Sequence, residues 1–380
     1  MKKIALLGFG VVGKGAYDII AKRDDMEVAR VLVRRPIDEI AAISTTDIAD
    51  IVSDPSIDTV VEVMGGVHPA FEYISAALRA GKNVVTANKA VISACYRELT
   101  ALAAENSVAL RCTAAVGGGI PWLINLERCR RIDTVTEVSG IMNGTTNYIM
   151  DAMHRAPVAF ADILKKAQEL GYAEADPSAD IDGDDIRRKL TISANIAFDA
   201  LLQEEDIPMF GIRTVTDGDI ATFQRAGYVC KLIATARRTE SGVAAWLEPT
   251  LVDSHALEAA VPANYNLISF QSEYLGRQSY YGQGAGRYPT ASNVVQDCVD
   301  IACGKKAFYA DKAAAMQPDN SGVVHSYYVR TAKADAWLTS VTEKAMGDGV
   351  VTAPVSVETM LGWAKAKLAE DPALFLAAIG

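Results

Sequence analysis

Residues 3–23, KIALLGFGVVGKGAYDIIAKR, decide the fold expected for the first half of this chain. The segment begins as a short apolar strand, continues into a G-x-G-x-x-G motif at residues 8–13, and then takes on helical periodicity. In this strand–turn–helix context the glycines permit a tight turn and let backbone N–H groups approach a pyrophosphate at the helix N-terminus. The stretch therefore predicts a dinucleotide-binding loop. Its candidate cofactor contacts are Gly8, Gly10, Val11, Val12 and Gly13.

The next expected strand, MEVARVLV at residues 26–33, bears on the choice of dinucleotide. An acidic residue at its end would favour NAD, because that carboxylate binds the ribose 2′-hydroxyl. The strand ends instead in Arg34-Arg35-Pro36. Two guanidinium groups suit a 2′-phosphate, so NADP(H) is favoured and NAD(H) stays possible. The alternative is two exposed arginines on a loop.

Strands and helices alternate from residue 57 onward: TVVEVMGG (59–66), PAFEYISAALRAG (69–81) and NVVTANKA (83–90). This alternation predicts an α/β fold with a doubly wound parallel sheet of the Rossmann type. The loops at the carboxyl ends of its strands line the ligand crevice. Lys89 follows one such strand, and we expect it to contact cofactor or substrate unless it is a plain surface lysine.

The acidic stretch GYAEADPSADIDGDDIRRK, residues 171–189, is the main candidate for chemistry. Asp185 and Lys189 are four residues apart near the start of an expected helix, so they share one face. With Glu174 upstream, a lysine beside a carboxylate can exchange a proton at a carbonyl group. A solvated acidic loop with a surface ion pair is the alternative. A calcium loop is excluded, because Lys189 stands where the bidentate Glu is needed.

This stretch resembles the signature of homoserine dehydrogenases, with Ala167, Gly171, Asp176-Pro177 and residues 180–189 in register. Three further blocks match the family in the same order along the chain. They are VVEVMGG…ALRAGKNVVTANKA, the NGTTNY motif at residues 143–148, and residues 284–291.

The resemblance implies reversible hydride transfer between NAD(P)H and L-aspartate 4-semialdehyde, which gives L-homoserine on the route to threonine and methionine. It implies that Lys189 donates the proton, that Asp185 holds Lys189 and the substrate, and that Glu174 binds the substrate ammonium group. Lys89 would lie near the substrate carboxylate and the nicotinamide. Tyr172 and Thr145 are further substrate candidates, and Gly171 and Gly286 are further cofactor candidates. From the residues alone, Thr and Asn of the NGTTNY motif serve equally well as helix caps.

One family feature is altered. The family binds a monovalent cation (Na⁺ or K⁺) with a Glu side chain and several backbone carbonyls, and the corresponding positions are Thr113, Val116, Gly118 and Ile120. Thr113 replaces the Glu and removes the charged ligand. A weak site formed by the carbonyls of Val116, Gly118 and Ile120 is what remains.

These blocks predict three regions. Residues 1–130 with about 287–318 would form the nucleotide-binding domain. Residues 131–286 would form an α+β catalytic and dimerisation domain with a mixed sheet, including strands near 134–141, 243–252, 267–275 and 278–284. Residues 319–380 would be a C-terminal tail, faintly similar to the start of an ACT regulatory domain. The resemblance implies a homodimer, and a higher oligomer is possible. We expect no kinase-like segment before the fingerprint.

Composition narrows the function classes. Acidic residues outnumber basic ones, 47 to 37, which disfavours nucleic acid or an anionic membrane as a partner. Neither a signal peptide nor a membrane span is expected. The six cysteines form no C-x-x-C pair and the four histidines form no H-E-x-x-H motif, so a zinc site is not expected. We expect the cysteines to be reduced thiols in the cytoplasm. The alternatives are another NADP-linked oxidoreductase of a small amino-acid aldehyde or ketone, and a non-catalytic nucleotide sensor.

Overall fold

The structure is a computed structural model that describes residues 1–305 and 316–380, and it separates into two compact units. Unit 1 contains Met1–Asp133, Asn195–Leu201 and the described part of Gly282–Ala315. Unit 2 contains Thr134–Ala194, Leu202–Tyr281 and Met316–Gly380. The return segment expected at about 287–318 includes residues 306–315, which lie outside the described residues.

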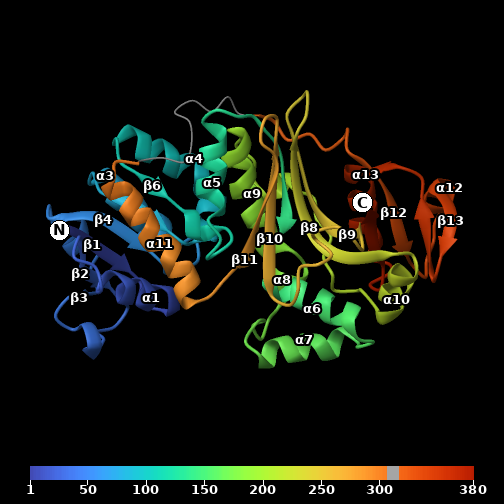
Figure 1. Cartoon of the computed structure of the whole chain (residues 1–380), viewed down its shortest axis with the longest axis horizontal. Coiled ribbons are helices and arrows are strands. Elements are labelled where there is room, and N and C mark those ends of the chain that lie inside the picture. The colour runs from blue at the N-terminus through green and yellow to red at the C-terminus, as the bar shows by residue number, and fades with distance from the viewer. Residues whose placement is uncertain (306–315) are drawn as a thin grey trace. The chain divides into compact units, whose positions relative to one another are not determined.

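Unit 1 is built on a six-stranded parallel sheet with the order β3-β2-β1-β4-β5-β6 (Figure 1). The order reverses direction at β1, as in a doubly wound nucleotide-binding fold, so the predicted Rossmann-type sheet is confirmed. The strands are β1 (Lys2–Leu7), β2 (Met26–Leu32), β3 (Ser44–Thr45), β4 (Ile57–Glu62), β5 (Asn83–Thr86) and β6 (Leu110–Arg111).

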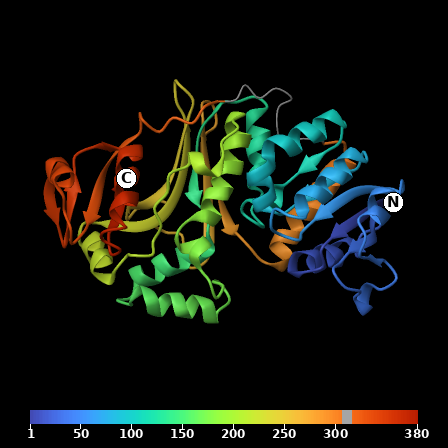
Figure 2. The same cartoon turned by 180° about the vertical axis from the view of Figure 1, so that it is seen from behind.

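Helices cover this sheet, and α1 packs beside α11 while α3 packs beside α4 (Figures 1 and 2). Apolar residues of β1, β4 and β5 share one core cluster with those of α1 and α11, including Leu6, Ala16 and Val294. The helices are α1 (Val11–Ile20), α2 (Ala49–Val52), α3 (Ala70–Arg79), α4 (Lys89–Glu105), α5 (Trp122–Arg130) and α11 (Arg287–Ala302). Residues far apart in sequence therefore complete one nucleotide-binding unit.

Unit 2 contains a mixed, mostly antiparallel sheet with the order β11-β10-β7-β8-β9-β16-β12-β14-β13, and β15 pairs with β12. The β16–β9 pair is parallel. The strands are β7 (Val135–Ile141), β8 (Tyr228–Arg238), β9 (Val243–Asp253), β10 (Tyr265–Ser272), β11 (Gly276–Gln283), β12 (Val324–Arg330), β13 (Thr342–Met346), β14 (Gly349–Thr352), β15 (Val355–Ser356) and β16 (Phe375–Ile379). The expected mixed sheet is confirmed; strand β8 is an addition that sequence analysis does not identify.

Its helices are α6 (Gly144–Arg155), α7 (Phe160–Glu169), α8 (Ser178–Ile181), the first part of α9 (Asp184–Phe198), α10 (Asp217–Arg225), α12 (Ala336–Val341) and α13 (Val357–Lys367). The residues expected as a C-terminal tail supply β12–β16 to the same sheet. Buried Glu248 of β9 links to that segment, because its carboxylate accepts hydrogen bonds from His325 at 2.9 Å and Tyr327 at 3.1 Å. Among the described residues, no helix is both long and apolar enough to cross a membrane.

Candidate active site

The start of α9 holds a buried ion pair. Lys189 Nζ lies 2.7 Å from Asp185 Oδ2 and donates a second hydrogen bond, also 2.7 Å long, to the Met142 carbonyl oxygen. Lys189 is only 8% exposed and Asp185 only 7%. The spacing of four residues thus places both groups on one helix face, as the sequence predicts, and rules out the solvated surface pair considered as the alternative. The Met142 carbonyl is a contact that sequence analysis does not find.

Asn143 joins this pair to a second carboxylate. Its Nδ2 donates to Asp180 Oδ1 at 2.7 Å and to Asp185 Oδ2 at 2.8 Å. Its Oδ1 accepts from the Thr146 N–H at 2.8 Å and caps α6. The capping role expected for the NGTTNY motif is therefore present at Asn143. The same side chain also bridges two acids, for which the sequence gives no signal.

The bridge has an electrostatic consequence at Asp180. Burial raises the pKa of this carboxyl group, and the nearby charge of Asp185 raises it further. The hydrogen bond from Asn143 and the charge of Lys189 oppose the rise. Lys189 and Asn143 therefore compensate two carboxylates that would otherwise repel each other.

The loop between α7 and α8 carries the remaining substrate candidates. The Thr145 hydroxyl donates to the Tyr172 carbonyl oxygen at 2.5 Å, and the Tyr172 ring meets the edge of Tyr148 at a centroid distance of 5.1 Å. Gly171 adopts a φ of +75°, which favours glycine at this turn. Glu174 is exposed. Thr145 thus uses its hydroxyl to hold the loop that presents Tyr172 and Glu174.

The glycine-rich loop of unit 1 has the shape that a dinucleotide needs. Gly8 adopts a φ of +106°, and a Cβ on Gly13 would lie 2.4 Å from the Gly8 carbonyl oxygen. Gly10 precedes α1 without a side-chain cap, and a Cβ there would meet nothing within 4 Å. Two glycines are thus required by the turn while the third leaves open space before the helix N-terminus, so these residues fit a pyrophosphate. Val11 and Val12 begin α1.

Two other segments border this nucleotide-binding region in unit 1. Arg34 and Arg35 follow β2 after one residue, Val33, and are exposed. Gly286 precedes α11 with a φ of +132°, and the next residue, Arg287, pairs with Asp18 of α1 at 2.7 Å. The return helix is therefore tied to the helix that begins at the glycine motif.

Buried Glu62 organises the loops after β4 and β5. Its carboxylate accepts hydrogen bonds from the Thr86 hydroxyl at 2.6 Å and the Met64 N–H at 2.7 Å, and burial raises its pKa. Asn88 Nδ2 lies 3.4 Å from the same carboxylate, and Asn88 Oδ1 caps α4. These contacts fix Lys89, which is partly buried, as the first residue of α4. Sequence analysis does not identify Glu62 as the organising group.

The residues expected to hold a monovalent cation also have protein partners. Asn293 Nδ2 donates to the carbonyl oxygens of Gly118 at 2.6 Å and Ile120 at 3.0 Å. Thr113 donates from its N–H and its hydroxyl to Asp297. A side-chain amide thus hydrogen-bonds two of the three carbonyls expected as cation ligands, and Thr113 supplies no charged ligand, so this set of residues does not fit a monovalent cation. In the described part of the chain, no group of three or more His, Cys, Asp or Glu side chains could hold a metal ion.

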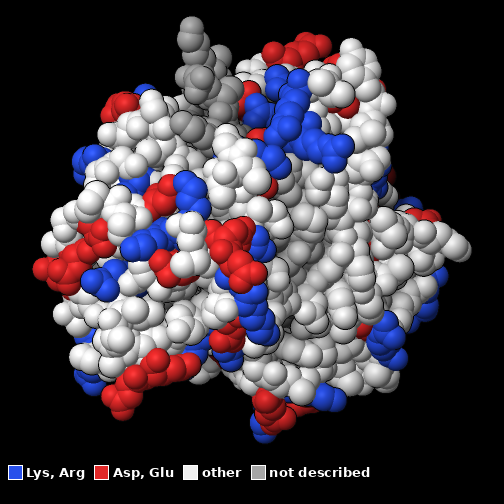
Figure 3. All heavy atoms as spheres, turned by 60° about the vertical axis from the view of Figure 1, so that its left-hand side comes forward, with Lys and Arg blue, Asp and Glu red and all other residues white. Residues whose placement is uncertain are grey.

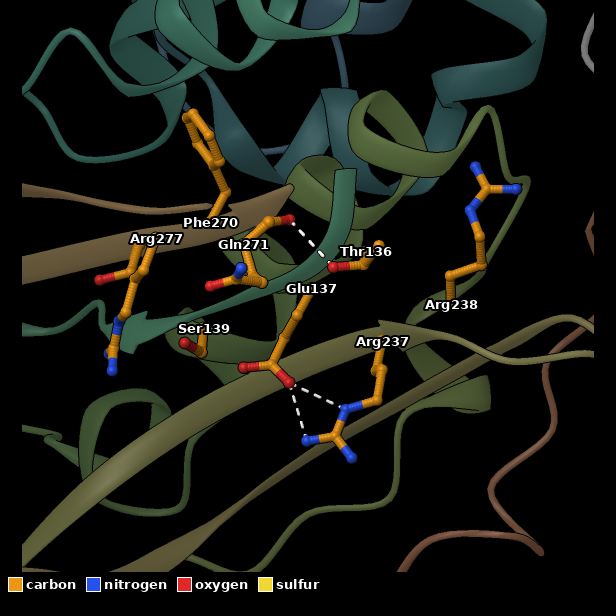
Figure 4. A pocket seen from close by; sticks show the side chains of 9 residues that line it. Thr136, Glu137, Ser139, Arg237, Arg238, Phe270, Gln271 and Arg277 are labelled. Carbon is orange, nitrogen blue, oxygen red and sulfur yellow. Dashed lines mark hydrogen bonds and ion pairs between the residues drawn. The ribbon is translucent and has the colours of Figure 1, made fainter. Parts of the chain in front are cut away.

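A surface pocket of unit 2 has none of these candidates in its lining. Figure 4 shows it over strands β7, β8, β10 and β11, with Arg237 paired to Glu137 at 2.7 Å. It is lined by Thr136, Glu137, Ser139, Arg237, Arg238, Ser269, Phe270, Gln271 and Arg277. Because it contains none of the residues singled out above, the pocket is not the proposed catalytic site.

Comparisons with known proteins place the two units in one family. A family described as "Homoserine dehydrogenase, NAD binding domain" matches residues 8–112, and "Homoserine dehydrogenase" matches residues 121–299. The chain belongs to the homoserine dehydrogenase family. It is 39% identical over 313 residues to the homoserine dehydrogenase of Bacillus subtilis and 40% identical over 311 residues to that of Pseudomonas aeruginosa. Each match covers 79% of this chain and 72% of the relative.

Solved structures agree over the whole length. A homoserine dehydrogenase from Thiobacillus denitrificans has a TM-score of 0.88 and 32% identity, covering 100% of this chain and 98% of that one. The Staphylococcus aureus homoserine dehydrogenase at pH 8.5 has a TM-score of 0.79 and 30% identity, covering 100% and 99%. The chain is therefore an oxidoreductase with the activity of the homoserine dehydrogenase family. Neither another substrate nor a non-catalytic sensor is favoured.

Proposed function

We propose that Lys189 is the acid–base residue in the reversible reduction of L-aspartate 4-semialdehyde to L-homoserine by NAD(P)H. One observation carries this proposal: the Lys189 ammonium group is held in a buried place by Asp185 and the Met142 carbonyl. A lysine ammonium has three N–H groups, and these two contacts use two of them. The third is available to hydrogen-bond the aldehyde oxygen.

When bound, NAD(P)H supplies the hydride to the aldehyde carbon. As the C–H bond forms, the carbonyl π electrons move to oxygen, and Lys189 donates a proton to the developing alkoxide. In the reverse direction Lys189 accepts the proton of the homoserine hydroxyl. Asp185 pairs with the ammonium group and keeps Nζ in place, and Asn143 keeps Asp185 in place.

The remaining residues bind the amino-acid part of the substrate. We assign Glu174 to the substrate ammonium group and Lys89 to its carboxylate, with Lys89 also contacting the nicotinamide. Tyr172 contacts the substrate, and Thr145 positions the loop that carries Tyr172, with Gly171 as its turn. Unit 1 accordingly binds the nucleotide, through residues 8–13 and Gly286, and unit 2 carries the acid–base group.

For the cofactor we propose a preference for NADP(H) over NAD(H), in which Arg34 and Arg35 bind the 2′-phosphate. Arg34→Asp should lower the ratio of kcat/KM for NADPH to that for NADH by about tenfold or more, because a hydrogen bond to a charged group contributes roughly 1.5–3 kcal/mol. Arg79→Asp, at an exposed arginine that ends α3, is the matched control and should leave the ratio unchanged. An unchanged ratio in Arg34→Asp would assign the 2′-phosphate to another residue.

We propose a homodimer in a reducing cytoplasm. Figure 3 includes a broad area without charged side chains, and unit 2 exposes Tyr274, Leu275 and Tyr281 around β11. Exposed apolar side chains along a sheet edge are typical of protein interfaces. The six cysteines, all within the described residues, form no disulfide. Light scattering coupled to gel filtration gives the mass; a monomer at micromolar concentration would contradict the dimer.

The activity itself is tested by homoserine-dependent reduction of NADP⁺ and of NAD⁺, followed at the nicotinamide absorbance. We expect turnover with both and faster turnover with NADP⁺. Binding of NADPH without turnover of homoserine would mean that the substrate is a different one.

A further inference from the structure

The loop Gly117–Ile120 of unit 1 is held by a side-chain amide. Asn293 of α11 is 8% exposed, and its Nδ2 lies 2.6 Å from the Gly118 carbonyl oxygen and 3.0 Å from that of Ile120. Carbonyl oxygens can only accept hydrogen bonds, so the NH₂ end of the amide must face them. Its two N–H groups satisfy both acceptors at once.

This arrangement occupies the place that a monovalent cation needs. Hard cations are bound by converging oxygen atoms, and the carbonyls of Gly118 and Ile120 converge on the amide nitrogen. The partial positive charge of the N–H groups faces the same lone pairs that would bind the ion. A cation and the Asn293 amide therefore exclude each other at this loop.

Thr113 removes the charge that a cation site would use. Its N–H and hydroxyl donate to the two oxygens of Asp297, at 2.9 Å and 2.7 Å, and Asp297 also accepts from the buried Arg111 at 3.1 Å. A carboxylate in place of the Thr113 hydroxyl would repel the Asp297 carboxylate instead of donating a hydrogen bond to it. Thr113 therefore supplies no charged ligand for a cation, and Asn293 supplies an amide in place of the ion.

The loop needs such support because its backbone is crowded. Gly118 has a φ of +53°, and a Cβ there would lie 2.4 Å from the Gly284 carbonyl oxygen. The Gly119 N–H donates to the Gln283 carbonyl at 3.2 Å. The Asn293 bonds therefore also fix the segment that leads to Gly286, which precedes α11.

We propose that the Asn293 amide replaces a monovalent cation in this enzyme, which therefore folds and works independently of Na⁺ and K⁺. The proposal concerns cation binding and does not rest on the roles assigned to Lys189 or Lys89. Its test therefore measures stability as well as activity. The cation proposal and the proposed catalytic roles can then fail separately.

The decisive variant is Asn293→Asp, which has the same shape and turns the amide nitrogen into an oxygen. Three oxygens would then converge, one of them charged, which creates a cation site. We expect its Tm to be roughly 2 °C or more higher in NaCl or KCl than in choline chloride at equal ionic strength, because binding to the folded state alone stabilises it. Wild-type Tm and kcat should be the same in all three salts.

Asn320→Asp is the matched control. Asn320 is 9% exposed, and its Oδ1 accepts from the Ala245 N–H at 2.8 Å, a bond that aspartate keeps. Its Nδ2 faces one carbonyl oxygen, that of Asp206 at 3.5 Å, so aspartate there creates no pair of close, converging carbonyls that could bind a cation. Its Tm should not depend on which of the three salts is present. A rise in wild-type Tm that is specific to NaCl or KCl would overturn the proposal even if Asn293→Asp failed to fold. So would an Asn293→Asp variant that folds with the same Tm in all three salts.

Discussion

Lys189 and Lys231 are two buried lysines of unit 2 that differ in their surroundings. Lys189 Nζ contacts a carboxylate and a carbonyl, whereas Lys231 Nζ contacts two neutral oxygens, Asn147 Oδ1 at 2.9 Å and the Val261 carbonyl at 2.8 Å. Burial lowers the pKa of Lys231 to about 8. Both lysines are almost fully buried, so burial alone does not distinguish a catalytic lysine from a structural one.

The contacts of Asn147 explain what Lys231 does. Asn147 Nδ2 donates to the Ala263 carbonyl at 2.8 Å and the Tyr265 carbonyl at 3.2 Å, while its Oδ1 accepts from Lys231. Together these groups attach α6 and β8 to the chain before β10. Lys231 completes a hydrogen-bonded junction between these segments. Lys189 instead lies beside the Asp185 carboxylate, which Asn143 holds in place.

The largest expected effect separates the two lysines by activity. Lys189→Ala should lower kcat by ~10²–10⁴-fold, because it removes the general acid. Steady-state kinetics of homoserine oxidation measure the loss, and circular dichroism checks that the variant is folded. Near-full kcat in a folded Lys189→Ala variant would mean that Lys189 is not the general acid. It would also mean that Lys189 and Lys231 do not differ in function as proposed.

Asn143→Ala should have the next largest effect. It removes a hydrogen bond to charged Asp185, worth roughly 1.5–3 kcal/mol, so kcat should fall by about 10- to 100-fold. Asp180 and Asp185 then repel without a bridge, so one of them should take up a proton at higher pH and shift the acid limb of the pH–rate profile upward. A lower Tm with an unchanged pH profile would mean that Asn143 only caps α6.

Lys231→Met should change stability rather than chemistry. It leaves Asn147 Oδ1 without its donor, which costs about 1–3 kcal/mol of unfolding free energy, and it leaves the Val261 carbonyl with only the longer hydrogen bond from Asn147 Nδ2 at 3.3 Å. Denaturant unfolding measures this loss. We expect kcat per folded molecule to stay within about threefold of the wild type; a loss comparable to that of Lys189→Ala would contradict the structural role.

The last expected effect is the pH dependence of that stability. The pKa of Lys231 is about 8 in the folded protein against the usual 10.5, so between these values the unfolded state binds more protons. Stability attributable to Lys231 should therefore rise with pH from about 8 to about 10.5 and be lost as pH falls through 8. The difference in unfolding free energy between wild type and Lys231→Met isolates this slope; a constant difference over this range would refute it.

Sequence patterns predict the features that depend on neighbouring residues. The glycine motif at 8–13 and the spacing of Asp185 and Lys189 are local signals, and both have the expected geometry. Strand β8 is not identified, because its apolar run YVCKLIATARR contains a lysine whose partners come from other segments. A buried lysine resembles a surface lysine until those partners are known.

Contacts between distant segments account for the rest. Asn143 meets Asp180 and Asp185 across about forty positions of sequence, and Asn293 meets Gly118 across 175. A single asparagine carries no signal of which oxygens it will meet. The sequence does show the loss of the charged ligand at Thr113, but the amide of Asn293 is visible only in the fold.

The central claim is that Lys189, and not the equally buried Lys231, moves the proton of the homoserine dehydrogenase reaction. Homoserine-dependent reduction of NADP⁺ by wild type, Lys189→Ala and Lys231→Met, at equal concentrations of folded protein, tests it most directly. We predict turnover by wild type and Lys231→Met and a loss of at least ~10²-fold in Lys189→Ala. Equal rates in the two variants, or a wild type that does not oxidise homoserine, would contradict the account.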